Sequence, residues 1–183
     1  MDNLNITIEK LSKNESQEYL DAFKSFEFKN KLNFADWYGS DEGGNYLWLI
    51  SISKENLPIG FLTYDMFKLE QEIFIYIDKI FVLGEYKKYN NDSEVKLINN
   101  KRASTILFEK IMSEGYNILT LNSANEKLSS YYKKKYNFVY NPKVCELFAK
   151  KVNKEAKGFL YLDLQQSTRN ISKDPDLSKL FGI

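Results

Sequence analysis

Two adjacent cations, Lys101 and Arg102, lie at the start of a segment with the pattern of an amphipathic helix, LINNKRASTILFEKIM at residues 97–112. The first turn of a helix carries the positive end of the helix dipole, so cations are unfavourable there. A helix start also presents free backbone N–H groups, which bind anions. We therefore predict that an anion binds beside Lys101 and Arg102; the alternative is that both side chains simply point into water.

The residue types limit the available chemistry. The chain has no histidine, which excludes Ser–His and Cys–His nucleophile pairs and HExxH zinc sites. Cys145 is the single cysteine, so CxxC sites are excluded, and no GxG occurs among the eight glycines. We expect no metal site, and any acid–base chemistry must come from Glu, Asp, Tyr, Lys, Ser or the backbone.

The bulk composition is that of an ordinary folded protein. The chain has 183 residues, 43% of them hydrophobic, and a formal net charge of +1. So balanced a charge gives no reason to expect a nucleic-acid partner. Met1 is followed by a polar stretch, and no apolar run approaches the roughly 18 residues of a membrane span. We expect a cytoplasmic protein with no membrane partner, in agreement with the lone cysteine.

Hydrophobic periodicity predicts an α/β fold built on one mixed sheet. Segments with strand patterns lie at 5–12, 45–53, 59–67, 72–83, 116–124, 138–142 and 158–164. Segments with helical patterns lie at 14–26, with Asn14 as a possible N-cap, and at 31–39, 101–114 and 125–136. The helix at 101–114 connects two strands, so we expect 72–83 and 116–124 to be parallel neighbours that splay apart at one end.

Two motifs resemble those of the GNAT superfamily of acyl-CoA-dependent N-acyltransferases. IFVLGEYKK (80–88) resembles the end of the family's fourth strand, with Gly84 in place of the Pro and Lys87 in place of the Arg of Pro-Glu-Tyr-Arg-Gly-Lys. ANEKLSSYYKKKYNF (124–138) resembles a later motif in which Asn125 and Tyr132 keep the family's spacing. There Leu128 replaces an Ala, and one extra residue precedes Asn137 and Phe138.

This resemblance runs from about Asn5 to Leu164. It implies a central twisted mixed β-sheet flanked by helices, in a single domain over residues 1–164, with a polar tail over 165–183. The family's pyrophosphate loop, Arg/Gln-x-x-Gly-x-Gly/Ala, has lost its glycines here. After an insertion at about 89–98, its counterpart is NNKRAS at 99–104.

The resemblance also implies acetyl-CoA as cosubstrate. Its binding residues would lie on the fourth strand, on the degenerate loop and on the later helix: Ile80, Phe81, Val82, Lys87, Lys88, Asn100, Lys101, Arg102, Ala103, Ser104, Thr105, Asn125 and Tyr132. Lys133, Lys134 and Lys135 are interpreted as a solvated helix end, with the 3′-phosphate of CoA as an alternative partner.

An N-acyltransferase needs an acid near the sulfur and a base or water relay for the amine. Tyr132 is the candidate acid, and Tyr131 is its neighbouring rival. Asp78 interrupts an apolar run and is the first candidate base, with Glu72 as the second. A water chain without a dedicated carboxylate is the third possibility.

Two functions follow from the resemblance. The first is transfer of an acetyl group from acetyl-CoA to a primary amine of a protein or small molecule. The second is a catalytically degenerate GNAT-fold module that binds or regulates. A toxin-like enzyme that acetylates charged tRNA is a third alternative, against which the charge balance argues. The oligomeric state is open, with a homodimer as one option.

Overall fold

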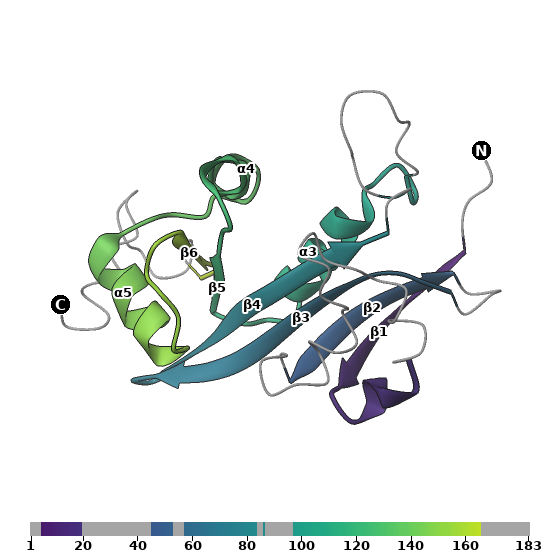
Figure 1. Ribbon diagram of the computed structural model, residues 1–183, viewed down its shortest axis with the longest axis horizontal. Helices are drawn as coiled ribbons and strands as arrows, with labels where there is room; N and C mark the ends of the chain where they lie inside the picture. The colour runs from purple at the N-terminus through teal and green to yellow at the C-terminus, as the bar shows by residue number, and fades with distance from the viewer. Residues whose placement is uncertain (1–4, 20–44, 53–56, 84–85, 87–96, 166–183) are drawn as a thin grey trace. The chain divides into compact units, whose positions relative to one another are not determined.

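The computed structural model describes residues 5–19, 45–52, 57–83, 86 and 97–165 (Figure 1). The strands are β1 (Ile6–Ser12), β2 (Tyr46–Ile52), β3 (Leu57–Leu69), β4 (Glu72–Val82), β5 (Ile118–Asn122) and β6 (Phe159–Asp163). The helices are the 3-10 turn η1 (Glu15–Tyr19), α3 (Ala103–Met112), α4 (Glu126–Tyr136) and α5 (Pro142–Lys151). The helix expected at 31–39 lies outside the described residues, as does the tail beyond residue 165.

All six strands form one mixed sheet whose order follows the chain, β1-β2-β3-β4-β5-β6 (Figure 1). β2 is antiparallel to β1 and β3, and β6 is antiparallel to β5. β4 and β5 are parallel, with Phe74 opposite Ile118 and Ile77 opposite Leu121. The predicted α/β class and the parallel pair are thus confirmed. The ladder ends at Ile77 and Leu121 although β4 continues to Val82; a divergence of the strands beyond that point remains a prediction.

The chain divides into two compact units. The first contains Met1–Tyr64 and Asp78–Ser113, and the second contains Asp65–Ile77 and Glu114–Ile183. The first half of β3 and the last residues of β4 therefore belong to unit one together with α3. Unit two holds β5, α4, α5 and β6. A single domain over 1–164 stays a prediction.

Unit one begins with a capping box after β1. The backbone N–H of Ser12 donates to the Glu15 carboxylate at 2.7 Å, and the N–H of Glu15 donates to the Ser12 hydroxyl at 3.3 Å. Hydrogen bonds to the carboxylate from the Ser12 backbone, and secondly from the Ser12 side chain, lower the pKa of Glu15. The expected capping role of Asn14 is wrong: Ser12, two residues earlier, has the glutamate partner three positions on. Only residues 15–19 of the helix expected at 14–26 are described, and they form the 3-10 turn η1.

α3 packs on the sheet of unit one through a helical stripe of buried residues, Ala103, Leu107, Phe108 and Ile111. Its Lys110 ammonium lies 5.2 Å from the centre of the Trp48 ring on β2. Contacts between α3 and β2 fix the helix against the strands. This packing sets the position of the helix start, where the two cations lie.

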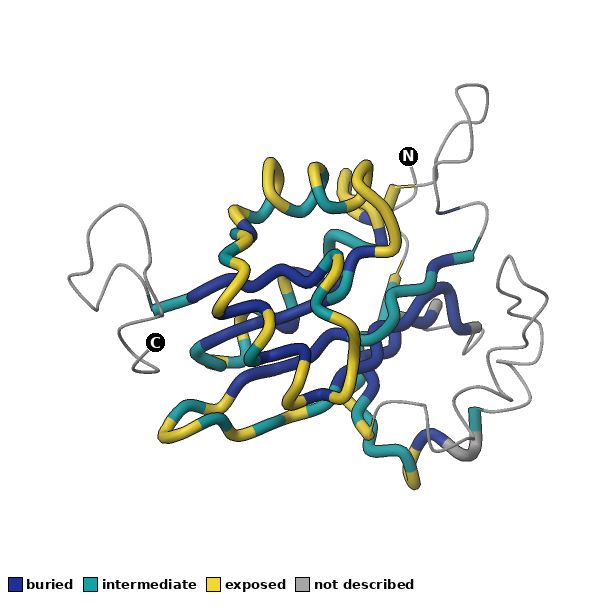
Figure 2. Tube along the Cα trace, turned by 60° about the vertical axis from the view of Figure 1, so that its left-hand side comes forward, coloured by how far each residue is buried: buried dark blue, intermediate teal, exposed yellow. Residues whose placement is uncertain are grey.

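Unit two has its own hydrophobic core. Phe74 and Tyr76 alternate onto one face of β4 and pack with Phe159 and Tyr161 of β6 and with α5. Phe74 lies 4.7 Å from Phe148 of α5, and Tyr76 stacks on Phe159 at 5.6 Å between ring centres. Figure 2 shows the strands largely buried and the outer sides of the helices exposed. The near-continuous apolar run of β4 is buried from Phe74 to Ile77, as its sequence predicted.

The strand expected at 138–142 is wrong, and the helix α5 was not anticipated. Val139 alone forms a bridge, with Tyr161. α5 then starts at Pro142, and the Asn141 side chain caps it by accepting from the N–H groups of Lys143 at 3.1 Å and Val144 at 3.4 Å. Asn before Pro is a helix-start signal, because Pro at the first helical position loses no internal hydrogen bond.

Within the described ranges, no helix combines the length and the apolar character needed to cross a bilayer.

Candidate active site

The start of α3 is an unusual helix N-terminus. Arg102 is its N-cap residue, with extended backbone angles, and its side chain makes no capping hydrogen bond. The first turn contains no acidic residue. The N–H groups of Ala103 and Ser104 have no acceptor within the helix, by helix geometry. This end of α3 therefore presents backbone donors and positive dipole potential to an anion.

The N–H of Thr105 is less available than expected. It donates to the Arg102 carbonyl oxygen at 2.9 Å, and the N–H of Ile106 donates to the same oxygen at 3.1 Å. The backbone N–H groups of the first turn that remain available for an anion are therefore those of Ala103 and Ser104.

A tight turn precedes this helix start. Its two asparagines adopt the backbone conformation that glycine adopts most easily. Asn99 and Asn100 have φ of +49° and +63°, in the left-handed region. Ile98 and Lys101 exchange two backbone hydrogen bonds across them, at 2.8 and 2.9 Å. Asn is the residue after Gly that best tolerates this conformation. Asn99 was not among the predicted site residues, although the Asn-Asn pair is itself a turn signal.

The two cations have different surroundings. The Lys101 ammonium forms an exposed ion pair with Glu109 at 2.7 Å, two turns along α3. Arg102 is exposed at the cap position. Lys101 thus has a carboxylate partner on the helix that follows it, whereas the Arg102 side chain makes no capping hydrogen bond.

The predicted strand residues lie at the end of β4 in the same unit. Val82 is buried, and Ile80 and Phe81 are half-buried. β3 approaches this end closely, since a Cβ on Gly60 would lie 3.0 Å from the Phe81 carbonyl oxygen. Lys87 and Lys88 lie outside the described residues.

Asp78 lies four residues before this strand end. Its side chain is only 7% exposed, and its carboxylate is 3.3 Å from the Lys79 ammonium. The ion pair with the adjacent Lys79 explains how an acid is tolerated in this apolar run.

Glu72 lies at the opposite end of β4. Its carboxylate accepts a hydrogen bond from the Asn117 side chain at 2.8 Å, just before β5. Six residues of strand separate it from Asp78, which corresponds to roughly 20 Å. The two candidate bases therefore cannot serve one reaction centre.

α4 carries the second motif in unit two. Asn125 is its N-cap, and the side-chain oxygen accepts from the Leu128 N–H at 3.0 Å. Asn125, which this chain shares with the family motif, is thus the residue that caps the start of the helix. Leu128, which replaces the Ala of the motif, is 38% exposed.

Tyr132 lies among aromatic rings. Ring centres of Tyr131, Phe138 and Tyr136 lie 5.5, 5.9 and 6.4 Å from its own. Burial, with smaller contributions from the charges of Tyr131 and Tyr136, raises the pKa of Tyr132 to about 12. A phenol with this pKa is fully protonated at neutral pH and can donate a hydrogen bond.

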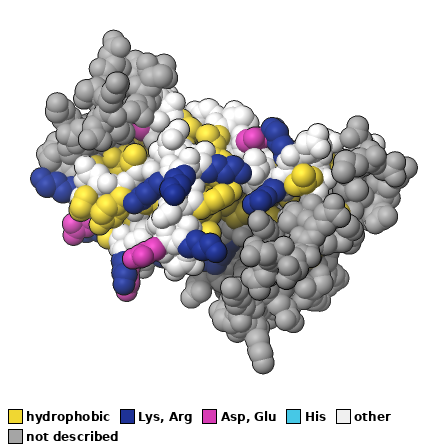
Figure 3. All heavy atoms as spheres, turned by 90° about the horizontal axis from the view of Figure 1, so that it is seen from above, with side chains coloured by type: hydrophobic (Ala, Val, Ile, Leu, Met, Phe, Trp, Pro, Cys, Tyr) yellow, Lys and Arg dark blue, Asp and Glu magenta, His cyan; other side chains and the backbone are white. Residues whose placement is uncertain are grey.

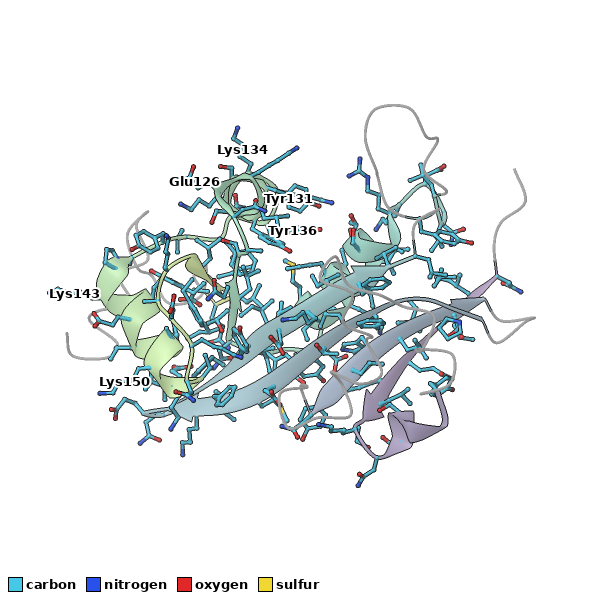
Figure 4. All side chains as sticks on the ribbon, in the orientation of Figure 1. Glu126, Tyr131, Lys134, Tyr136, Lys143 and Lys150 are labelled. Atoms are coloured by element: carbon cyan, nitrogen blue, oxygen red, sulfur yellow. The ribbon has the colours of Figure 1, made fainter. Side chains whose placement is uncertain are left out.

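The rival Tyr131 has a different environment. Its hydroxyl accepts a hydrogen bond from the Lys135 ammonium, one helical turn on, at 3.1 Å. Figure 4 shows Tyr131 and Tyr136 leaving α4 on a different side from Lys134. The Tyr131 oxygen is thus engaged by a cation at an exposed site, which favours Tyr132 as the donor to a leaving group.

The last turn of α4 accommodates the extra residue that precedes Asn137 and Phe138 in the second motif. Asn137 has φ of +60° and takes the left-handed position that the family gives to glycine. The Phe138 N–H reaches back six residues to the Tyr132 carbonyl at 3.4 Å. This widened last turn lets Phe138 remain buried against Tyr132 despite the added residue.

The predicted residues therefore fall into two groups. Unit one holds Asp78, Ile80–Val82 and the loop and helix start at 100–105. Unit two holds Asn125 and Tyr132, together with Glu72 at the far end of β4.

Known structures share this arrangement of strands and helices. An integron cassette protein from the mobile metagenome of V. cholerae matches with a TM-score of 0.53 at 13% identity, over 76% of this chain and 88% of that one. A GNAT-family acetyltransferase from Staphylococcus aureus Mu50 matches with a TM-score of 0.53 at 15% identity, over 86% and 99%. AtaTR, solved with bound acetyl-CoA, matches with a TM-score of 0.54 at 13% identity, over 90% and 97%.

No protein-family model and no curated protein matches the sequence. At such low identities the structural similarity establishes the fold alone. The chain has the fold of the GNAT acetyltransferases, as the two sequence motifs predicted.

Proposed function

We propose that this protein transfers the acetyl group of acetyl-CoA to a primary amine of a protein or small molecule, in the cytoplasm. The observation that carries the proposal is the start of α3. A left-handed Asn-Asn turn leads into a helix whose first N–H groups are available and whose cap residue is a cation. These features suit a pyrophosphate at the position where GNAT enzymes bind CoA.

In the proposed reaction the neutral amine attacks the thioester carbonyl carbon. The carbon–sulfur bond breaks, CoA leaves as the thiolate, and the ammonium intermediate gives a proton to water or to a base. Backbone N–H groups near Ile80–Val82 would stabilise the oxyanion. Asp78 is the favoured base, because it lies near this end of β4 and Glu72 does not.

Tyr132 would act on the leaving sulfur. A thiol has a pKa of about 8.5, well below that of this phenol, so complete transfer of the Tyr132 proton is unfavourable. The physically consistent role is a hydrogen bond from the phenol to the developing thiolate, which then takes its proton from solvent. Such a bond strengthens as negative charge develops and therefore lowers the barrier.

The alternative is a binding module without catalysis. The loss of the loop glycines and the Lys101–Glu109 ion pair favour it, because both reduce what the helix start can offer to a phosphate.

Isothermal titration with acetyl-CoA, followed by a thiol-release assay with a panel of primary amines, separates the two functions. We expect binding in the micromolar range and thiol release that depends on the amine. Binding without release under any amine would support the module, and absence of binding would contradict both proposals.

A further inference from the structure

The segment from Ala124 to Lys157 differs from the rest of the chain in charge. It contains nine lysines and three glutamates, with no arginine or aspartate, although the whole chain is nearly neutral. All nine lysines are exposed. The segment comprises α4, α5 and their flanks, and it lies entirely in unit two.

Five residues define what we call the lysine–tyrosine face: Lys133, Lys134, Tyr140, Lys143 and Lys150. The Lys133 ammonium lies 5.6 Å from the centre of the Tyr140 ring. Lys143 and Lys150 are seven residues apart on α5 and point outward on the same side of it, while Lys134 points outward from α4 (Figure 4). Seen from above, basic side chains lie beside side chains of the hydrophobic class, which includes tyrosine (Figure 3).

Lys133, in the last turn of α4, lies over Tyr140, two residues before α5 begins at Pro142. Burial raises the pKa of the Cys145 thiol near the start of α5, and the charge of Lys133 at the end of α4 opposes that rise. Lys133 is therefore electrostatically close to α5 as well as to Tyr140. Lys143 lies in the first turn of α5, so both helices contribute positive charge near Tyr140.

Helix stability accounts for only part of this charge. Lys133–Lys135 and Lys150 lie in last turns, where cations suit the dipole. Lys143 lies in the first turn of α5, which has no acidic residue, and there a cation is unfavourable. In the described part of the chain no carboxylate forms an ion pair with Lys133, Lys134, Lys143 or Lys150. Glu146 is the carboxylate that interrupts the face.

We infer that the lysine–tyrosine face binds single-stranded nucleic acid, with lysines on phosphates and Tyr140 stacking on a base. Lys143 and Lys150 are about 10 Å apart along α5, a distance that two neighbouring phosphates of a single strand can span. Tyr140 is 52% exposed, so a base can reach its ring. An acidic protein would use the lysines but would have no need of an exposed tyrosine beside them. This inference goes beyond acetyl transfer and does not depend on it.

The test is fluorescence anisotropy with a labelled single-stranded RNA of about 12 nucleotides and, in parallel, a DNA of the same sequence. The full chain is titrated without acetyl-CoA from 50 to 300 mM salt. We expect the triple variant Lys134→Ala, Lys143→Ala, Lys150→Ala to bind at least tenfold more weakly at low salt, with a log–log salt slope reduced by about 2. Lys68→Ala, an exposed lysine on β3, is the control and should change affinity less than about twofold.

Tyr140 distinguishes nucleic acid from other polyanions. Tyr140→Ala should weaken RNA binding by roughly 5- to 100-fold, whereas Tyr140→Phe should bind like the parent. Competition by polyglutamate as effective as unlabelled RNA, together with no effect of Tyr140→Ala, would overturn the inference in favour of an acidic protein. Absence of binding by the parent at 50 mM salt, or equal binding by parent and triple variant, would also overturn it. Tighter binding of the RNA or of the DNA identifies the natural strand.

Discussion

At the residue scale, the aromatic surroundings of Tyr132 decide what its hydroxyl can do. Tyr131 and Tyr132 are adjacent on α4 and both are half-buried, yet the hydroxyl of Tyr131 is held by the Lys135 ammonium whereas the ring of Tyr132 packs against Phe138. The packing therefore gives two tyrosines with the same side chain different surroundings.

We expect Tyr132→Phe to lower turnover by roughly 10- to 1,000-fold with little change in the affinity for acetyl-CoA, because the lost hydrogen bond forms only as the thiolate develops. Tyr131→Phe is the matched control and should stay within about threefold of the parent, since it removes an exposed hydrogen bond. Steady-state kinetics of thiol release, with titration of acetyl-CoA, measures both. A normal kcat in Tyr132→Phe would assign the role to Tyr131 or to solvent.

The two carboxylates of β4 give the second test. Asp78→Asn should lower kcat/KM by about 10- to 100-fold and weaken its dependence on pH below neutrality, since an amide cannot accept the amine proton. Glu72→Gln should mainly cost about 1 kcal/mol of stability through its hydrogen bond to Asn117. Kinetics and urea unfolding of both variants provide the comparison. If Glu72→Gln is the slower enzyme, the assignment of the base is reversed.

At the element scale, α3 and α4 both begin with a polar or charged residue that the motifs contain, but their caps differ. Asn125 satisfies an N–H of its own helix, whereas the Arg102 side chain satisfies none. A helix start left open is the one that can take up a ligand.

Removal of the cations at α3 should therefore affect stability and binding differently. Arg102→Ala should leave the apo protein equally stable or more stable by a few tenths of a kcal/mol, and should weaken acetyl-CoA binding by about 1–3 kcal/mol. Lys101→Ala should have the smaller effect on binding, because Lys101 is paired with Glu109. Melting temperature without ligand and calorimetric affinity are the measurements, and the binding loss should shrink at high salt. Parent-like affinity in both variants would make the cations surface residues without a ligand.

Gly158 contacts Ser123, which lies three residues before the start of α4. It has φ of +82°, and an added Cβ would lie 2.7 Å from the Ser123 carbonyl oxygen. The Gly158 carbonyl also accepts hydrogen bonds from the backbone N–H and hydroxyl of Ser123, both at 2.9 Å. We expect Gly158→Ala to destabilise the protein by about 2–4 kcal/mol through backbone strain and displacement of this contact.

Gly115 is the matched control, because it has φ of +79° and no atom within 4 Å of an added Cβ. Gly115→Ala should cost only about 1 kcal/mol, the conformational part alone. Chemical denaturation of both variants is the measurement. Equal losses would mean that the contact with Ser123 contributes nothing.

The sequence predicted elements well where periodicity was the deciding factor. Alternation at Ile6 and Ile8 predicted β1, and the apolar run from Phe74 to Ile77 predicted a strand buried on both faces. α5 was missed because Asn141 and Pro142 were assigned to an expected strand at 138–142, although together they begin a helix. The sequence predicted which residues belong to the candidate site, but it did not predict the surroundings of each residue. The burial of Tyr132 and the left-handed turn at Asn99 and Asn100 depend on contacts and backbone angles that spacing does not encode.

At the scale of the whole molecule, the buried phenol of Tyr132 links catalysis to stability at high pH. Its pKa is about 12 in the folded state and about 10 when exposed, so above pH 10 the unfolded chain loses this proton first. Fewer protons on the unfolded chain mean that stability falls as pH rises. Below pH 10 Tyr132 has no effect on how the stability depends on pH.

Between pH 10 and 12 the parent should therefore lose up to about 2–3 kcal/mol more stability than Tyr132→Phe. Urea unfolding at pH 8, 10 and 11 measures the difference, with Tyr131→Phe as a second comparison. Parallel pH profiles of parent and Tyr132→Phe would show that the phenol is not protected in solution.

The order of the sheet also bears on how the chain folds as it is synthesised. Each strand pairs with the strand made immediately before it, so β1 to β4 can assemble as they leave the ribosome. One edge of β4 then stays unpaired until β5 has been synthesised. Ile118 of β5, which pairs with Phe74, is translated roughly 2 to 9 s after Phe74. During that interval the nascent chain exposes the apolar residues Phe74 to Ile77 on an unpaired edge, which is where a chaperone would be needed.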